Sequence, residues 1–205
     1  LLRGSVTKTV TRPNFNSLNP ALSVTAATMT VPGSGSGGNP DLDPIEATNY
    51  DLSLEYYPAK TSLVAVSGFY RSIDGYVQPY ASNETIGGRT YSITRTRNTR
   101  DGHLQGIETS YQQFFDFLPD AFRGLGFQAN YTYIEGKSEN PLTLAKQNIA
   151  QVAKHNYNVV LIYEKGSISS RLAYNWRGKF IDGFNQPGLQ PTTVWVQSRG
   201  QLDFS

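Results

Sequence analysis

The sequence predicts an all-β fold, an antiparallel transmembrane β-barrel segment with short periplasmic turns at one rim and long extracellular loops at the other. Three observations predict it. Apolar and polar residues alternate along many stretches, the connections between these stretches are alternately short and long, and charged residues recur on the polar face of nearly every stretch. A transmembrane barrel strand needs only about ten residues of alternating character, so the prediction depends on the repetition of a weak signal.

About eight strands are expected, and the first is the opening stretch LLRGSVTKTV. In the second, TNYDLSLEYY, Tyr50, Leu52 and Tyr56 share one face, while Asp51 and Glu55 share the other, as the alternation of a strand requires. The third, SLVAVSGFY, is apolar on both faces, so its pattern does not assign its sides. The expected strands lie near 1–10, 48–57, 62–71, 103–117, 124–135, 155–165, 167–178 and 193–205.

The later strands repeat the two-faced pattern. HLQGIETSYQQFF sets Ile107 and Tyr111 against Glu108 and Gln112, and FQANYTY sets aromatic residues and Ala against amides and Thr. NYNVVLIYE and ISSRLAYNWR place Tyr, Val, Leu and Trp on one face, and Asn, Glu and Arg on the other. No helix is expected except a short turn within 141–154.

The connections alternate in length along the chain. Short turns are expected at 57–63, 117–124 and 164–168, and long polar loops at 11–47, 72–102, 136–154 and 178–193. A soluble sandwich has no need of this alternation. A transmembrane barrel has it, because short turns gather at the periplasmic rim and long loops at the outer one.

The charged face of each strand predicts what surrounds the barrel. Burying many unpaired ionised groups would cost several kcal/mol each. We therefore expect the charged face to line a water-filled lumen and the Tyr and Leu face to contact lipid, with Tyr and Trp forming girdles near the strand ends. The residues expected to line the lumen are Asp51, Glu55, Glu108, Arg171 and Arg177.

The composition excludes several classes of function. The 205 residues include no Cys and two His, which excludes disulfides and thiol chemistry, and we expect neither a metal site nor a cofactor. A net charge of +2 without runs of like charge gives no sign of nucleic-acid binding. No arrangement of Ser, His and Asp suggests hydrolysis, so we do not expect an enzyme. No window approaches 18 apolar residues, so no transmembrane helix is expected.

Several sequence blocks carry a family resemblance. They include SVTKTVTRPNFNSLNP, GNPDLDPIEATNYDLSLEYY, VSGFYRSIDGYV, GIETSYQQFFDFLP, HNYNVVLIYEKGSISSRLAYNWR and the final QLDFS. Together, and in this order, these blocks resemble the barrel domain of TonB-dependent outer-membrane receptors. Their style is closest to the proteobacterial branch linked to carbohydrate uptake.

The resemblance implies a barrel of 22 strands, an N-terminal plug domain, and energy relayed by the periplasmic protein TonB. It implies that residues 1–205 are part of the barrel domain, without the plug and the closing C-terminal strands. The whole receptor would lie in the bacterial outer membrane, among lipid and lipopolysaccharide, and would take up a scarce small-molecule nutrient, expected to be a carbohydrate. The lumen residues named above would then pair with one another or with the plug.

Ligand contacts are expected in the loops. Arg side chains could hydrogen-bond a sugar or an anionic siderophore, and aromatic rings could stack on a sugar. The alternative roles are a solvated loop face, contacts to lipopolysaccharide, and packing within the loops or the girdles. The Gly-rich VPGSGSGGNP lacks the Lys and the setting of a phosphate-binding loop, so we expect a flexible loop there. The candidate ligand residues are Tyr76, Tyr80, Tyr91, Arg95, Arg97, Arg100 and Trp195.

Three alternatives remain open at this point. The nutrient could be an iron-siderophore, which growth on chelated iron would distinguish from growth on an oligosaccharide. The chain could instead be a self-contained eight-stranded structural or adhesive barrel, which would refold alone in detergent. It could also be a soluble β-sandwich that binds carbohydrate, but the Tyr-rich faces would then leave large apolar patches in water.

Overall fold

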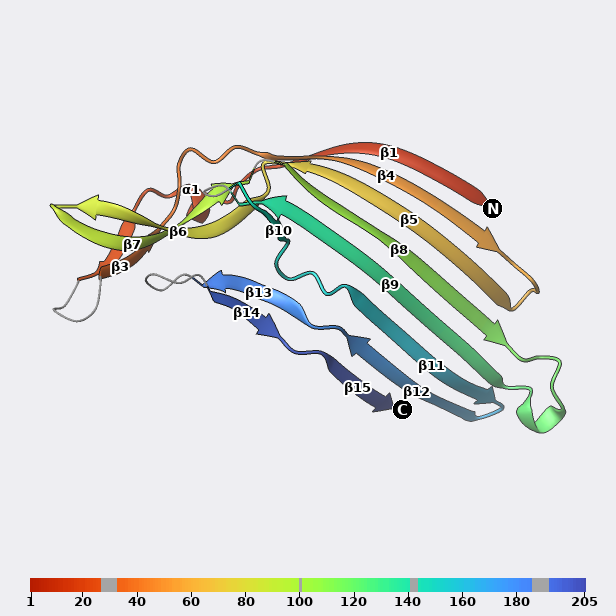
Figure 1. Cartoon of the computed structure of the whole chain (residues 1–205). Helices are drawn as coiled ribbons and strands as arrows, with labels where there is room; N and C mark the ends of the chain where they lie inside the picture. Colours follow the sequence, from red (N-terminus) through yellow and green to blue (C-terminus); the bar gives the residue numbers. More distant parts are fainter. Residues whose placement is uncertain (27–32, 100, 141–143, 186–191) are drawn as a thin grey trace.

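The computed structural model describes residues 1–26, 33–99, 101–140, 144–185 and 192–205. Its described residues form a nine-stranded sheet, a four-stranded sheet and a two-stranded hairpin. We call the nine-stranded sheet the wall and the four-stranded sheet the loop sheet. In Figure 1 the wall strands run side by side, with the loop sheet and the β13–β14 hairpin at one end and the short turns at the other.

The wall is an antiparallel sheet whose strand order is β1-β4-β5-β8-β9-β11-β12-β15, with β10 paired to the end of β9. The chain therefore crosses the wall back and forth in sequence order, and the loop-sheet strands lie in the excursions between crossings. The wall strands are β1 (Leu2–Thr11), β4 (Ile45–Tyr56), β5 (Ser62–Asp74), β8 (Asp101–Phe114), β9 (Leu125–Glu139), β10 (Lys146–Asn148), β11 (His155–Lys165), β12 (Ile168–Arg177) and β15 (Arg199–Phe204).

The loop sheet has the order β2-β3-β7-β6, in which β3 pairs with β7 in parallel. Its strands are β2 (Leu22–Thr25), β3 (Gly33–Gly37), β6 (Val77–Ile86) and β7 (Arg89–Asn98), and the separate hairpin joins β13 (Phe180–Asn185) to β14 (Thr192–Val196). Two single-turn helices, α1 (Phe15–Leu18) and the 3-10 helix η1 (Asp120–Phe122), complete the described elements. Neither is long and apolar enough to cross a membrane.

The structure confirms the all-β fold and the eight crossings, and it corrects the expected loops. Segments 11–47 and 72–102 contain the four strands of the loop sheet and the helix α1. The described part of 141–154 holds β10 and no helix. The last expected strand, 193–205, is two strands with different partners, since β14 pairs with β13 and β15 pairs with β12.

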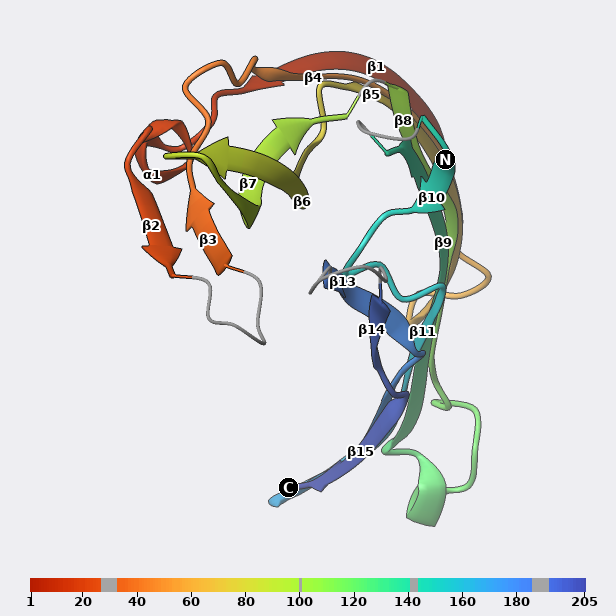
Figure 2. The same ribbon diagram turned by 60° about the vertical axis from the view of Figure 1, so that its left-hand side comes forward.

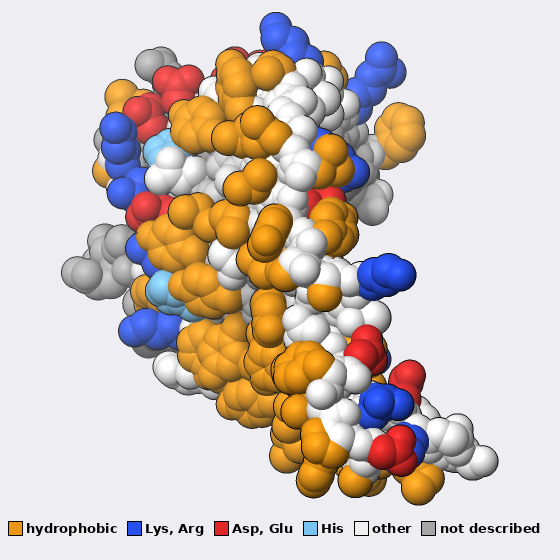
Figure 3. Space-filling view, turned by 90° about the vertical axis from the view of Figure 1, so that its right-hand side faces the viewer, with side chains coloured by type: hydrophobic (Ala, Val, Ile, Leu, Met, Phe, Trp, Pro, Cys, Tyr) orange, Lys and Arg blue, Asp and Glu red, His pale blue; other side chains and the backbone are white. Residues whose placement is uncertain are grey.

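The registers assign the two faces of the wall. Tyr50 lies opposite Tyr70 and Leu54 opposite Val66, so β5 directs Tyr70 and Val66 to the apolar face and Ser67 to the other. We call the face that carries Tyr50 and Leu54 the outer face. Figure 3 shows hydrophobic side chains gathered in a continuous band with charged residues at its margins. Leu52 is 59% exposed and Leu54 is 55% exposed in the isolated chain.

The wall is a single curved layer that does not close on itself. β1 and β15 each pair with one neighbour, and Figure 2 places them at opposite edges of the curve. The self-contained eight-stranded barrel is therefore not the structure that the described residues form. A β-sandwich is also excluded for the wall, because neither of the other sheets formed by the described residues packs on its outer face.

Packing is concentrated at the loop end of the molecule. Among the buried hydrophobic residues of the described part, only Val160 lies in a crossing strand of the wall. The others belong to the loop sheet, the β13–β14 hairpin or the connections near them: Leu42, Tyr80, Ile93, Ile149, Ala153, Phe180 and Ile181.

Candidate functional site

The inner face of the wall carries rows of polar side chains across adjacent strands. Asn130 lies opposite Asn158, Asn158 opposite Asn175, and Asn175 opposite Gln201. The side-chain amide of Asn158 donates a hydrogen bond to Asn175 Oδ1. Neighbouring amides on one face of a sheet offer both donors and acceptors at regular spacing, which suits a ligand with many hydroxyl groups. A groove of about 560 Å³ includes this row.

The five residues predicted to line the lumen all lie on this inner face. Glu108 shares a cross-strand row with Arg177, and Glu55 shares the row of Asn130. Asp51 and Arg171 occupy inner positions of β4 and β12, where side chains alternate between the two faces. The sequence alternation therefore predicted the shared face of these residues.

The partners of these inner residues differ from the expected mutual pairs. Glu55 Oε1 lies 3.1 Å from Arg3 Nη1, and Asp51 accepts from Ser5 Oγ at 3.4 Å. Arg177 donates to the carbonyl of Gln151 at 3.2 Å, and its guanidinium lies 3.9 Å from the ring centroid of Phe180. No ion pair in the described part of the chain joins two of the five.

The outer face carries aromatic pairs toward the loop end. Tyr70 stacks on His103 with centroids 6.0 Å apart, and Tyr157 stacks on Trp176 at 5.1 Å. His155, the first residue of β11, accepts or donates a hydrogen bond of 2.8 Å with the Tyr131 hydroxyl. Aromatic side chains with one polar edge suit the boundary between hydrocarbon and water. These pairs lie at the loop-side strand ends, where the sequence predicts a girdle.

The loop sheet brings four of the seven candidate ligand residues onto one face. In the β6–β7 hairpin, Tyr80 lies opposite Arg95, and the strand alternation places Tyr91 and Arg97 on the same face of β7 as Arg95. The sequence predicted these residues in a common loop but not in a common sheet. Their grouping follows from the hairpin register.

Arg95 is bound within the loop sheet and offers few free donors. Its Nε and Nη2 donate to the two carboxylate oxygens of Glu84 at 2.8 and 3.0 Å, and its Nη1 donates to the Gly38 carbonyl at 2.8 Å. These hydrogen bonds lower the pKa of Glu84 and raise that of Arg95. Such a bidentate pair fixes both side chains. Arg97 donates to Ser82 Oγ at 3.2 Å, and its buried Nε has no protein partner.

Tyr80 is placed differently from the sequence expectation. Its side chain is 2% exposed, so its ring cannot stack on a ligand in this conformation. Its hydroxyl donates to Gln78 Oε1 at 2.9 Å and accepts from Gln147, whose amide also donates to Gln78 at 3.2 Å. Burial is the main cause that raises the pKa of Tyr80 to about 12. Gln147 is distant in the sequence, so no local pattern could have shown this contact.

The remaining candidate residues lie elsewhere. Tyr76 is half-buried at the base of the β6–β7 hairpin, where its carbonyl accepts from the Thr99 amide at 2.6 Å. Trp195 lies on β14 and is 47% exposed. Arg100 lies outside the described residues. In the described part of the chain, no group of three His, Asp or Glu side chains is placed to hold a metal ion.

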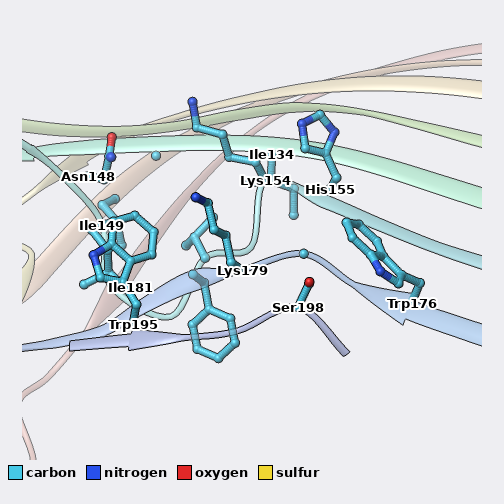
Figure 4. A pocket seen from close by; sticks show the side chains of 14 residues that line it. Ile134, Asn148, Ile149, Lys154, His155, Trp176, Lys179, Ile181, Trp195 and Ser198 are labelled. Carbon is cyan, nitrogen blue, oxygen red and sulfur yellow. The ribbon is translucent and has the colours of Figure 1, made fainter. Parts of the chain in front are cut away.

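Sequence reasoning missed a cavity of about 490 Å³ near the loop end of the wall. β11 begins at His155, whereas its neighbour β9 continues to Glu139, and β13 extends the line of β12. The segment 149–154 crosses the resulting notch between β9 and β13. Ile149, Val152 and Lys154 of this segment line the cavity together with residues of β9, the end of β12, β13 and β14. Figure 4 shows this lining from close by.

Comparison with known proteins gives a match over the whole chain. The family model described as TonB dependent receptor-like, beta-barrel matches residues 1–205. No curated protein matches the sequence significantly.

Solved structures of similar fold include receptors and a transporter. The ferric enterobactin receptor PfeA from Pseudomonas aeruginosa, in a variant bound to enterobactin, aligns with a TM-score of 0.70 and 17% identity over 99% of this chain and 30% of that chain. The siderophore receptor PirA from Acinetobacter baumannii aligns with a TM-score of 0.66 and 17% identity over 99% and 32%. The copper transporter OprC aligns with a TM-score of 0.65 and 16% identity over 99% and 28%. This chain therefore spans about a third of the length of these structures.

Proposed function

Because this chain belongs to the TonB-dependent receptor-like β-barrel family, we propose that it forms part of the wall and outer loops of an energy-coupled receptor that imports a scarce nutrient. The family is one of receptors of the bacterial outer membrane, not of enzymes. The observation that carries the proposal is the family match over 1–205. The two-faced wall supports it, since one face suits lipid and the other suits a water-filled lumen.

The rest of the receptor lies outside residues 1–205 in this proposal. The plug domain and the remaining barrel strands are supplied by other parts of the protein, and TonB engages a segment that precedes the barrel. The alignment to about a third of each solved structure supports this division. The inner polar residues, Glu108 and Arg177 among them, then contact the plug or the nutrient across the lumen.

The proposed substrate is a neutral, hydroxyl-rich nutrient, which makes a carbohydrate the first candidate. The amide row of the inner face supports it, because amides recognise hydroxyl groups without a net charge. The neutralisation of Arg95 by Glu84 also supports it, because it removes one cation from the loop face. Tyr91 and Arg97 are the proposed loop contacts, whereas Tyr80 supports the sheet from within.

A ferric siderophore is the second candidate. The observation that favours it is the similarity in fold to receptors for siderophores, one of them bound to enterobactin. The carboxylates and catecholates of siderophores require cationic donors, and Arg97 has donors that the loop sheet leaves unused.

Growth and uptake of a gene-deletion strain test the two candidates. We expect loss of growth on one oligosaccharide, restored by the full-length gene, and unchanged growth on chelated iron. Loss on one chelated iron source alone would assign the siderophore instead. Normal growth and uptake on all of the oligosaccharides and all of the chelated iron sources would contradict the proposed function.

Variants of the full-length receptor then test the site. Arg97→Ala with Tyr91→Ala should lower uptake at least tenfold at unchanged receptor levels. The control Val66→Ala, on the outer face, should leave uptake unchanged. If the double variant took up the nutrient as fast as the Val66→Ala control, the loop face would not be part of the binding site.

A further inference from the structure

We propose that the cavity at the notch above β11 binds an anionic, phosphate-bearing lipid of the outer leaflet. The inference rests on the proposed outer-membrane location of the wall and is independent of which nutrient is imported. The residues that line the notch belong to β9, the 148–155 segment, the end of β12, the 178–179 connection, the β13–β14 hairpin and Ser198.

Backbone hydrogen bonds hold the notch open on both sides. The segment that crosses it alternates between its two neighbours. Ile149 N–H donates to Gly136 of β9 at 3.1 Å, whereas Gln151 N–H donates to Ile181 of β13 at 2.5 Å. The carbonyl of Lys154 then accepts from the Ile134 N–H at 2.9 Å, and the carbonyl of His155 accepts from the Gly178 N–H at 2.8 Å. The cavity is therefore a fixed feature of the wall rather than a gap between independent loops.

The lining is apolar where the segment and the hairpin meet. Ile149, Phe180 and Ile181 are buried, and Ile134, Trp176 and Trp195 complete the apolar surface. A cavity of about 490 Å³ is within the usual range of ligand sites, which are mostly apolar with a few polar groups. Such a surface fits hydrocarbon rather than a hydroxyl-rich nutrient.

Two lysines supply the charge of the site. Lys154 and Lys179 both line the cavity, and in Figure 4 their side chains extend in the same direction. Lys154 Nζ lies 3.4 Å from Glu135 Oε1, and Lys179 Nζ lies 5.5 Å from the ring centroid of Trp195. In the described part of the chain, Lys179 has no carboxylate partner. The pair thus leaves positive charge beside an apolar cavity, which complements a phosphate joined to acyl chains.

The position of the cavity selects a membrane lipid as the occupant. His155 and Trp176 line it, and both belong to the aromatic pairs of the outer face. Aromatic residues at this position mark the level of lipid headgroups. An acyl chain could therefore enter the apolar part while the phosphate stays at the lysines. The long-loop end of the wall faces outward, which makes the outer leaflet the source.

Lipid titration of the full-length receptor in detergent tests the proposal, with native mass spectrometry as the readout. The probes are lipid A, phosphatidylglycerol and phosphatidylcholine of matched chain length, and inorganic phosphate. We expect the two anionic lipids to bind at least tenfold more tightly than phosphatidylcholine. Inorganic phosphate at the same concentration should not displace them. Displacement by phosphate alone, or equal binding of phosphatidylcholine, would overturn the proposal.

Three variants locate the site. Lys154→Gln with Lys179→Gln should weaken binding of the anionic lipids at least tenfold. Lys137→Gln is the matched control, because Lys137 also approaches Glu135, at 3.6 Å, but does not line the cavity. It should change binding less than twofold. Ser198→Trp keeps both lysines and fills the cavity, so it should also weaken binding at least tenfold.

Unchanged binding by the double variant or by Ser198→Trp would overturn the site. Gel mobility before and after boiling shows that each variant still folds as a barrel. Because lipid binding is measured without nutrient uptake, a receptor that binds lipid but imports neither candidate nutrient would contradict only the proposed function.

Discussion

The wall and the loop sheet are both built from antiparallel hairpins, yet they place their apolar side chains in opposite ways. On the outer face of the wall, Leu52 and Ile107 are more than half exposed. In the loop sheet, Ile93 is fully buried and Tyr80 nearly so. The chain itself therefore leaves the apolar residues of the wall uncovered, as the proposed contact with lipid requires, whereas the loop sheet is stabilised by its own small core. Similar substitutions should consequently have different effects in the two regions.

Truncation of an isoleucine in each region should give the largest difference. Ile93→Ala removes a buried side chain and should cost the loop sheet about 2–5 kcal/mol. Ile107→Ala, on the outer face of β8, should change stability by about 0.5 kcal/mol, because its surroundings in the bilayer are already apolar. Hydrogen exchange of the full-length receptor in lipid measures both, with loss of protection in β6 and β7 alone for Ile93→Ala. Loss of protection across the wall as well would show that the two regions unfold together.

Introduction of an arginine at neighbouring positions of β5 should separate the two faces of the wall. Val66→Arg places a charge on the outer face and should destabilise the barrel by about 2–4 kcal/mol if it lies near the middle of the bilayer. Ser67→Arg places the same charge on the inner face, directly opposite Glu108, where water and a carboxylate receive it. Its cost should be below about 1 kcal/mol. Denaturant unfolding in phospholipid vesicles measures both, and equal costs would contradict the assigned faces.

This pair of positions also shows how far the sequence determines the wall. Where apolar and polar residues alternate, as around Tyr50 and Asp51, the alternation alone predicted the faces that the registers show. The β5 stretch is apolar on both sides, and only its pairing to β4 and β8 assigns Val66 outward and Ser67 inward. The local sequence pattern is thus sufficient to assign the two faces of a strand only where one face is apolar and the other is polar.

The loop sheet could not be predicted in the same way. Its β7 strand mixes Tyr91 and Ile93 with arginines on one face and is polar on the other, and β3 consists of Gly and Ser. The parallel pairing of β3 with β7 joins residues such as Gly35 and Ile93 that are far apart in the sequence. A Gly is needed at position 35 because there is no room for a side chain: a Cβ would lie 2.8 Å from Ile93 Cδ1. The notch cavity was missed for a similar reason, because its lining comes from four separate stretches of the sequence, 134–136, 148–155, 176–181 and 195–198.

Removal of a buried amide should have an intermediate effect on the loop sheet. Gln147→Leu deprives Gln78 and Tyr80 of a donor in a buried site, which should cost about 1–3 kcal/mol. Gln112→Leu is the matched control, because Gln112 is exposed on the inner face of the wall. Limited proteolysis should cleave within 72–102 faster in the first variant and at the original rate in the second. An unchanged rate for Gln147→Leu would show that the three polar side chains do not hold the loop sheet to β10.

The ion pair of Glu84 and Arg95 should have the smallest effect, and it should depend on pH. The Glu84 and Arg95 side chains are 26% and 22% exposed, so their bidentate contact should contribute no more than about 1 kcal/mol. Hydrogen bonds from Arg95 lower the pKa of Glu84 in the folded state. The contribution is therefore complete above the pKa of the unfolded carboxyl group and is lost as the pH falls through the lower, folded value.

A Glu84→Gln variant isolates this effect, because it keeps the size of the side chain and removes the titration. The native loop sheet should lose protection from hydrogen exchange as the pH is lowered below about 4, relative to the variant, and the two should differ by a constant amount near neutral pH. Amides of β11, in the wall, serve as the internal control, since the hydrogen bonds of this ion pair stay within the loop sheet and Gly38. If the wall lost protection in parallel with the hairpin, the pair would act on the whole molecule. The distinction between a wall with exposed apolar residues and a loop sheet with its own core would then fail.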